Sequence, residues 1–191
     1  MIFIRKPRPE EIRAYLSAQK DKPFSYADVG ATKTQPPGGY TVDHNRVRLS
    51  EGPAAFERAV NAIREWKMFA MPWVQLCWPD TPIVEGATVA VLVRHLGFWS
   101  LNAARIIYVV DEDGADKRFG FAYGTLPDHA ERGEERFTVE FQAKDQSVWY
   151  DVCAMSQPNF LARLGYPFAR HLQKRFARDS KNAMKNAVLL S

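Results

Sequence analysis

Phe119–Phe141 reads FGFAYGTLPDHAERGEERFTVEF, with two alternating segments around a charged middle. Side chains of a β-strand point in turn to opposite faces, so FGFAYGTL and EERFTVEF are predicted to be strands. The intervening PDHAERG contains proline, glycine and charges, which are typical of a turn. This stretch therefore predicts an antiparallel hairpin, and neighbouring segments extend it into a sheet.

Other strand-like segments lie on both sides of the hairpin. The β-branched segments GATVAVLVRHLG (86–97) and ARIIYVVDEDG (104–114) are predicted to be central strands. SVWYDVCAMS (147–156) is predicted to follow the hairpin as a strand, and YTVDHNRVRLS (40–50) to form the first strand. Short strands are predicted near residues 74–78 and 82–84. Turn-rich segments join these strands, which indicates an antiparallel meander.

Two helices are predicted to accompany the sheet. An apolar stripe at helical spacing runs from Phe56 to Trp66. The C-terminal helix is predicted to begin at Pro158, to be interrupted at Gly165 and Pro167, and then to continue to the end of the chain. Its apolar side carries Phe168, Leu172, Phe176, Met184 and Ala187, and its basic side carries Arg170, Lys174, Arg178, Lys181 and Lys185.

The chain divides into an extension and one main domain. Residues 1–39 are predicted to be an N-terminal extension, with a short helix in RPEEIRAYLSAQK (8–20) followed by an irregular arm rich in proline and glycine. Residues 40–191 are predicted to form one α+β domain, in which a curved antiparallel sheet wraps around the long C-terminal helix. This arrangement buries the apolar faces of both.

Composition narrows the class of protein. The 191 residues are 46% hydrophobic, so a core can form without a disulfide or a metal. Cys77 and Cys153 lie in apolar segments and form no C-x-x-C pair, so we expect two reduced thiols and no zinc. No signal peptide and no membrane span is predicted, which makes a cytoplasmic protein the expectation. The net charge of +4 divides into +6 after residue 157 and −2 before it.

Several segments resemble one known family. GYTVDHNRVRL, AFERAVNAIREWKMF, RIIYVVDE, FGFAYGTLPDHAERGEERFTVE and YDVCAMSQP together are similar to domain-of-unknown-function family nineteen-ninety, over about Pro23 to Lys185. We assign that family to the START-like, polyketide-cyclase-like helix-grip superfamily. The resemblance implies a cavity between sheet and C-terminal helix, where relatives bind lipids, sterols or other apolar molecules. It implies no particular activity. One departure is that only one helix, instead of a pair, follows the first strand.

The glycines and acidic residues of the opening stretch suggest two sites that we do not favour. GFAYG lacks the G-x-G-x-x-G spacing and no helix follows it, so Gly120 and Gly124 are predicted to bend the sheet rather than to bind phosphate. An oxygen-ligand cation site from Asp128, Glu131 and Glu134 is an alternative to a solvated turn, and the turn is the favoured interpretation. No metal and no cofactor is predicted.

Polar residues in line with apolar ones are the candidate ligand contacts. Glu135 shares a strand face with Phe137, Val139 and Phe141 by the count of two, and Arg105 is in line with Ile107 and Val109. A buried Arg105–Glu135 pair is therefore predicted, either as a structural pair or as the contact for the polar end of a ligand. The tentative ligand-binding set is Arg105, Tyr123, Thr125, His129, Glu135 and Tyr150, although the face of Tyr150 is left open.

Three functions are open at this point. The favoured hypothesis is binding of an apolar or amphipathic small molecule in the cavity. The second is an enzyme that uses Arg105, Tyr123, His129 and Glu135 on one cavity wall, although no catalytic motif such as G-x-S-x-G is present. The third is an interaction module that uses the basic helix. The aromatic residues of this helix lie on its apolar side, away from the basic residues. This separation argues against binding of single-stranded nucleic acid, which uses both kinds of side chain on one surface. The sequence determines neither the ligand nor the oligomeric state.

Overall fold

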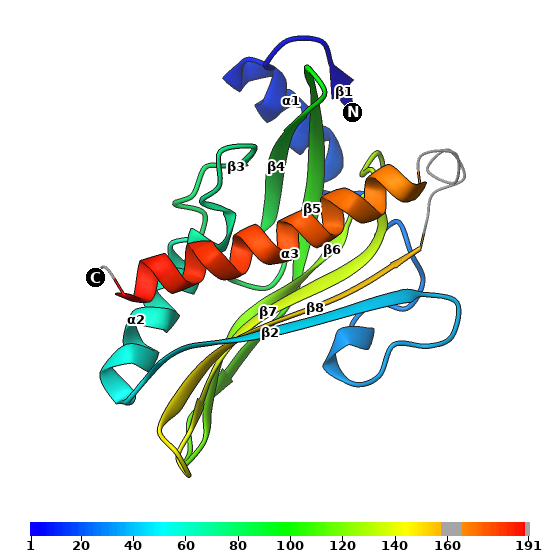
Figure 1. Ribbon diagram of the computed structural model, residues 1–191. Helices are drawn as coiled ribbons and strands as arrows, with labels where there is room; N and C mark the ends of the chain where they lie inside the picture. The colour runs from blue at the N-terminus through cyan, green and yellow to red at the C-terminus, as the bar shows by residue number, and fades with distance from the viewer. Residues whose placement is uncertain (158–165, 190–191) are drawn as a thin grey trace.

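A computed structural model describes residues 1–157 and 166–189 of the chain. Eight strands of this part form one antiparallel sheet, which curls around a long helix (Figure 1). The strands are β1 (Ile2–Phe3), β2 (Thr41–Glu51), β3 (Val74–Cys77), β4 (Thr88–His95), β5 (Phe98–Glu112), β6 (Lys117–Thr125), β7 (Arg132–Gln142) and β8 (Ser147–Gln157). Their order is β2-β8-β7-β6-β5-β4-β3, and β1 pairs with β5.

The hairpin predicted from the opening stretch is confirmed. β6 and β7 pair in antiparallel register, with Phe121 opposite Phe137 and Tyr123 opposite Glu135. The strand predicted at residues 82–84 is wrong, because this segment has no strand conformation. Pro79 and Pro82 lack the backbone N–H that a ladder requires. β5 begins at Phe98, six residues before the predicted start, because Leu96 and Gly97 adopt positive φ and close a tight hairpin from β4.

Helices cover the two faces of the sheet. On the concave face lie α2 (Pro53–Arg64), the short 3₁₀-helix η2 (Lys67–Phe69) and α3 (Tyr166–Leu189). α1 (Pro9–Gln19) and the 3₁₀-helix η1 (Ala31–Lys33) belong to the N-terminal segment on the other face. The predicted α+β helix-grip arrangement is confirmed. The predicted helix start at Pro158 and the Gly165 part of the predicted interruption lie outside the described residues, and α3 includes Pro167 without a break.

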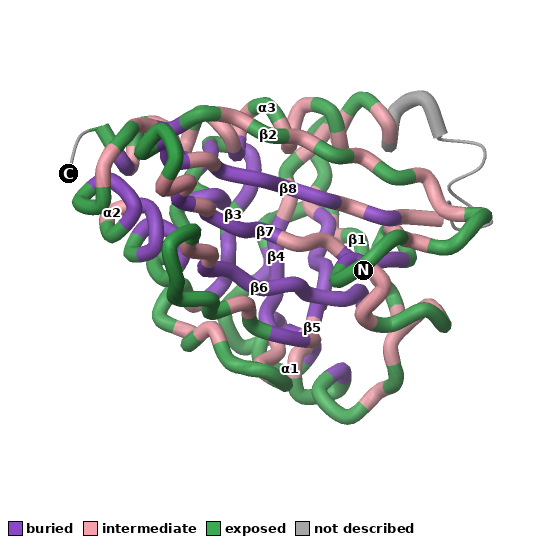
Figure 2. The backbone as a smooth tube through the Cα atoms, turned by 90° about the horizontal axis from the view of Figure 1, so that it is seen from below, coloured by how far each residue is buried: buried purple, intermediate pink, exposed green. Residues whose placement is uncertain are grey.

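An aromatic cluster forms the core between the concave face and the helices. The ring centroids of Trp66 and Phe121 lie 4.8 Å apart, and those of Phe121 and Phe137 lie 5.5 Å apart. Phe69 continues the cluster, 5.7 Å from Phe137 and 5.6 Å from Phe176 of α3. Each such pair contributes about 0.5–1.5 kcal/mol beyond its buried area, so the cluster ties η2 and α3 to the central strands. Figure 2 shows these strands buried along their middle and exposed at the hairpin tips.

The N-terminal segment packs on the opposite, convex face. Ile12 and Tyr15 of α1 belong to a second apolar core with Leu92, Leu101 and Leu126. β1 adds its two residues to the edge of β5. The N-terminal segment therefore covers part of the convex face through α1 and β1.

Glu134 holds the proline- and glycine-rich arm of this segment on the sheet. Its carboxylate accepts hydrogen bonds from Tyr26 Oη (2.9 Å), from the backbone N–H of Gly30 (2.7 Å) and of Thr32 (3.0 Å), and from the Thr32 hydroxyl. Glu134 is only 2% exposed. The interpretation of Glu134 as part of a solvated turn is therefore wrong. Its charge is buried because four donors of the arm replace water.

Gly120 and Gly124 have different roles. A Cβ on Gly120 would overlap the carbonyl oxygen of Phe137 on β7, so this glycine permits the close approach of two neighbouring strands. A Cβ on Gly124 would instead overlap the side chains of Tyr26 and Phe24, so this glycine makes room for the N-terminal arm. The prediction that both glycines only bend the sheet missed the second role.

Among the described residues, no helix combines the length and the apolar character needed to cross a membrane.

Replacing Gly120 with alanine should destabilise the sheet. The added methyl group overlaps backbone atoms of β7, which cannot rotate away, so we expect the free energy of unfolding to fall by about 2–3 kcal/mol. Gly38→Ala is the matched control, because a Cβ there meets nothing within 4 Å. It should change stability by less than about 0.5 kcal/mol in chemical denaturation. Equal effects of the two substitutions would contradict the close approach of β6 and β7.

Candidate functional site

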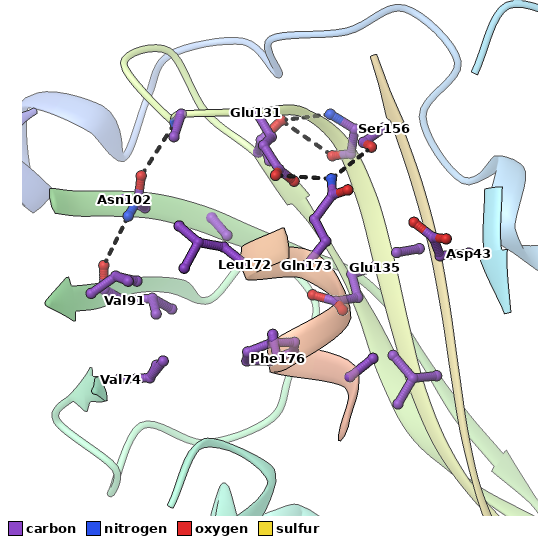
Figure 3. A pocket seen from close by; sticks show the side chains of 18 of the residues that line it. Asp43, Val74, Val91, Asn102, Glu131, Glu135, Ser156, Leu172, Gln173 and Phe176 are labelled. Atoms are coloured by element: carbon purple, nitrogen blue, oxygen red, sulfur yellow. Dashed lines mark hydrogen bonds between the residues drawn. The ribbon is translucent and has the colours of Figure 1, made fainter. Parts of the chain in front are cut away.

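A cavity of about 470 Å³ lies between the concave face of the sheet and α3. Figure 3 shows part of its wall, with Leu172, Gln173 and Phe176 of α3 facing Glu135 and Asn102 of the sheet. The apolar part of the lining is Phe69, Trp73, Val74, Val91, Val93, Ala104, Val152, Ala154, Met155, Leu172, Phe176 and Ala177. Polar residues at β7, β2 and the β6–β7 connection complete it, so the cavity is amphipathic.

Glu135 and Tyr123 form a hydrogen-bonded pair in the wall. Tyr123 Oη donates to Glu135 Oε2 at 2.9 Å, and cross-strand pairing of β6 with β7 holds the two residues opposite each other. Loss of solvation is the main cause that raises the pKa of Glu135 to about 8; the hydrogen bond from Tyr123 opposes it, and the nearby Glu131 and Asp43 act in the same direction as desolvation. Glu135 therefore carries a proton for most of the time at neutral pH. Its side chain is half-buried and lines the cavity.

The β6–β7 connection supplies His129 and Glu131. The backbone N–H of Glu131 donates to His129 Nδ1 at 3.0 Å, so the proton of the neutral ring is assigned to Nε2. Burial lowers the pKa of His129 to about 4, which keeps the ring neutral at pH 7. Burial also raises the pKa of Glu131, although the amide of Gln173 opposes this by donating to Glu131 Oε1 at 2.9 Å. The cavity thus contains two carboxyl groups with raised pKa values beside a neutral imidazole.

Polar contacts attach α3 to the sheet along this wall. Gln173 Nε2 also donates to Ser156 Oγ at 3.1 Å. Arg170 donates through Nη1 to Asp43 and through Nη2 to Asp43 Oδ1 (2.8 Å), so it binds the carboxylate with both ends of the guanidinium. Lys181 Nζ donates to Asn45 Oδ1 at 3.1 Å. These bonds set the separation between helix and sheet at the polar end of the cavity.

Four of the six predicted ligand contacts line the cavity. They are Tyr123, Thr125, His129 and Glu135. The hydroxyl of Thr125 is already used, because it accepts from the backbone N–H of Gly133 at 2.9 Å and lies 2.6 Å from Ser25 Oγ. The face predicted for β7 is confirmed, since Glu135 lines the cavity in line with the buried residues Phe137, Val139 and Phe141.

Arg105 is not among the lining residues, and the predicted Arg105–Glu135 pair is wrong. Its Nη2 donates to the backbone carbonyl oxygens of Gln19 (3.2 Å), Lys20 and Lys22 (3.0 Å), at the end of α1 on the convex side. The reason is a β-bulge between Ile106 and Tyr108, which shifts the register with β6. Counting by two from Arg105 to Val109 therefore crosses from one face to the other.

Tyr150 also lies outside the lining. It is fully buried, and its hydroxyl is 2.8 Å from Ser180 Oγ of α3. Tyr150 therefore helps to attach α3 to β8, so it is a core residue and not a ligand contact.

Sequence reasoning missed several polar lining residues, of which Gln173, Asp43 and Asn102 make the most contacts. Gln173 lies between Leu172 and Phe176 on a helix whose polar positions were read as solvated. Asp43 is in line with Val47 on β2, so alternation along that strand could have indicated it. Asn102 precedes the predicted start of β5, and its Oδ1 accepts from the backbone N–H of Ala130 at 3.2 Å.

Comparisons with known proteins agree with this architecture. The family model described as "Domain of unknown function (DUF1990)" matches residues 25–183. The chain belongs to the DUF1990 family. It is 37% identical over 208 residues to a "UPF0548 protein" of Dictyostelium discoideum, covering 98% of this chain and 96% of the relative. It is also 37% identical over 201 residues to one of Deinococcus radiodurans, covering 98% and 99%.

Solved structures show the fold of this DUF1990 protein to be shared more widely. Ara h 8.0201 superposes with a TM-score of 0.50 at 17% identity, over 80% of this chain and 100% of that one. TTHA0849 from Thermus thermophilus gives a TM-score of 0.50 at 14% identity, over 78% and 98%. At these identities the likeness concerns the helix-grip fold alone.

The alternative cation site in this DUF1990 protein does not assemble. The carboxylate of Glu134 binds the arm on the convex face, whereas Glu131 lines the cavity on the concave face. Within residues 1–157 and 166–189, no group of three or more His, Cys, Asp and Glu side chains is placed to hold a metal ion.

The raised pKa of Glu135 should make stability depend on pH. The folded carboxyl has a pKa of about 8 against an ordinary value of 4.5, so the folded state binds the proton more tightly. The stabilisation is complete below about pH 4.5 and is lost as the pH rises through about 8. Glu135→Gln should therefore gain stability relative to the wild type between about pH 5 and about pH 9. We expect a gain on the order of 2 kcal/mol, discounted because the carboxyl is only half-buried.

Thermal unfolding across this pH range measures the difference. Glu140→Gln is the matched control, since Glu140 lies on the same strand but pairs with Arg46 and Arg118 outside the cavity. A melting-temperature difference for Glu135→Gln that stays constant with pH would show that Glu135 is an ordinary solvated acid.

Proposed function

We propose that this DUF1990 protein binds an amphipathic small molecule in the cavity between the sheet and α3. The observation that carries the proposal is the cavity itself, because about 470 Å³ with a largely apolar wall and a few convergent polar groups is typical of ligand sites. The apolar body of the ligand would lie against Phe69, Trp73 and Phe176. Its polar group would lie at Glu135 and Tyr123.

The enzyme hypothesis with four residues on one wall is wrong in that form. Arg105 lies on the convex face, so only Tyr123, His129 and Glu135 converge. A narrower version has support from one observation, because a carboxyl with a pKa of about 8 is suited to proton transfer near neutral pH. Proton transfer by Glu135 to or from a bound ligand is therefore the second candidate function.

The basic side of α3 does not favour a nucleic-acid partner. Arg170 binds Asp43, Arg178 Nε donates to Asp179 Oδ1 at 2.9 Å, and Lys181 binds Asn45. Three of the five residues of the basic side thus form contacts within the described part of the chain, which leaves only Lys174 and Lys185 for a row of phosphates. We infer that this side of the helix serves the fold and the cavity.

Filling the cavity should remove ligand binding. Ala154 of β8 lines the cavity and is half-buried, so Ala154→Phe places a ring in the space that the ligand would occupy. We expect the wild type to retain a small molecule from a cell extract, identified by mass spectrometry of the purified protein after organic extraction. Retention by Ala154→Phe should fall at least about tenfold, equal to about 1.4 kcal/mol.

The control for this experiment is Ala54→Phe, which adds the same ring to an exposed position of α2. It should retain as much ligand as the wild type. A wild type that retains nothing from extracts, or an Ala154→Phe variant that retains as much as the wild type, would contradict the proposed function.

A further inference from the structure

The hydrogen-bonding capacity of Glu135 is only partly used by the protein. Among the described residues, its side chain has one partner, the hydroxyl of Tyr123 on Oε2. Glu135 is one of the residues that line the cavity, and Figure 3 shows its carboxyl group beside α3. Arg170 of α3 does not reach Glu135, because its guanidinium binds both oxygens of Asp43. An acid in an apolar cavity without a cationic partner from these residues is suited to receive one from a ligand.

Aromatic rings line the same cavity. The ring of Phe69 stacks on that of Tyr123, with centroids 6.3 Å apart and planes at 27°. Phe176 of α3 lies 5.6 Å from Phe69, and both Phe residues line the cavity. The faces of aromatic rings attract cations, and they do so more strongly where water is excluded. This observation is independent of the carboxyl group and favours the same kind of ligand.

We propose that the ligand carries a protonated amine on an apolar or aromatic body, and that the amine binds Glu135 beside the rings of Tyr123, Phe69 and Phe176. This inference rests on the proposed function, because it names the class of ligand for the same cavity. Glu131 offers its second carboxyl oxygen to a remaining N–H group of the amine, whereas the amide oxygen of Gln173 already accepts from Arg170 Nη1 at 2.6 Å.

An anionic ligand is the competing class, because Lys174, Arg178 and Lys181 of α3 contribute to the lining. Arg178 pairs with the carboxylate of Asp179, whereas Lys181 donates to the neutral amide oxygen of Asn45, so the acid probe below tests whether these cations recruit an anion. A carboxylate ligand at the polar end would face Glu131 and Glu135. In their ionised forms these two groups repel a carboxylate, so at pH 8, where Glu135 is about half ionised, an acid should bind more weakly than its neutral analogue.

Binding of the amine involves a proton balance. The protonated amine binds the carboxylate form of Glu135, and the carboxyl proton leaves to solvent, so one proton is released for each amine bound from the protonated state. The titratable and charged groups that share the cavity wall with Glu135 include Tyr123 from β6, Glu131 from the connection and Asp43 from β2, together with Lys174, Arg178 and Lys181 of α3. Tyr150 of β8 lies outside the lining but interacts electrostatically with Glu135. Tyr123 and Tyr150 keep their protons, because their pKa values are raised well above the ordinary value.

The pH dependence follows from this balance. Affinity for the amine should rise with pH until Glu135 is ionised at about pH 8, by up to about tenfold per pH unit. It should fall again above about pH 10, where a primary amine loses its own proton. A neutral analogue of the same shape should lack the rising limb.

Three matched probes test the proposal, namely naphthylethylamine, naphthylethanol and naphthylacetate, which share one apolar body and differ in the terminal group. Titration of the full chain by naphthyl fluorescence gives each dissociation constant. At pH 8 we expect the amine to bind at least about tenfold more tightly than the alcohol, and the acid to bind most weakly. Glu135→Gln should reduce the amine-to-alcohol ratio to within about threefold. Glu140→Gln, the same replacement of a carboxyl group by an amide outside the cavity, should keep the wild-type ratio.

The outcomes separate the two proposals. If the alcohol or the acid binds as tightly as the amine, or if Glu135→Gln keeps the wild-type ratio, the amine inference is overturned and the ligand-binding function stands. If none of the three probes binds and the purified protein retains no small molecule, the proposed function fails and the inference fails with it. Retained alcohol binding by Glu135→Gln shows that this variant is folded.

Discussion

Burial of both faces of β7 is the constraint on which the other features of the structure depend. Phe137 and Val139 face the concave core and are fully buried, while Glu134 faces the convex side and is 2% exposed. Arg136 lies on the convex side as well, where it donates to the carbonyl oxygen of Thr32 at 2.7 Å and to Asp151 Oδ1 at 3.1 Å. Because one strand carries charged groups that water cannot reach, the N-terminal arm must supply backbone partners. The arm is therefore part of the condition for a stable sheet.

The position of a side chain could be predicted from the sequence where the local pattern decides it, and could not where contacts with distant residues decide it. Alternation along EERFTVEF placed Glu135 inside correctly, because the period of a strand is fixed by its backbone. The same count failed for Arg105, because the bulge at Ile106–Tyr108 inserts one residue and exchanges the faces. The partners of Glu134 lie more than one hundred residues away in sequence, so nothing near Glu134 distinguishes a buried acid from a solvated one. The apolar spacing predicted the C-terminal helix itself. The hydrogen bonds of Gln173 could not be predicted, because they depend on how α3 lies on the sheet.

The cavity exists because two kinds of contact hold α3 on the sheet. Towards its C-terminal end, Met184 and Val188 are fully buried and the helix packs against α2 and η2. Nearer its other end, Arg170 and Gln173 reach Asp43, Glu131 and Ser156 through long polar side chains. Long side chains place a helix farther from a sheet than direct apolar packing does. The cavity is the space that remains between Phe176 and these polar bonds. Glu131 and Glu135 lie in its wall.

Neutrality of the buried groups explains why such a cavity is compatible with a stable fold. An isolated carboxylate in this environment would cost several kcal/mol, so Glu135 retains its proton and His129 remains without its second one. The two shifts have opposite directions in pKa but the same cause, which is that desolvation disfavours the charged form of either group. Near neutral pH the polar end therefore carries hydrogen-bond donors and acceptors with little net charge. A cationic ligand that binds the carboxylate form of Glu135 must displace its proton, and this links occupancy of the cavity to pH through a single carboxyl group.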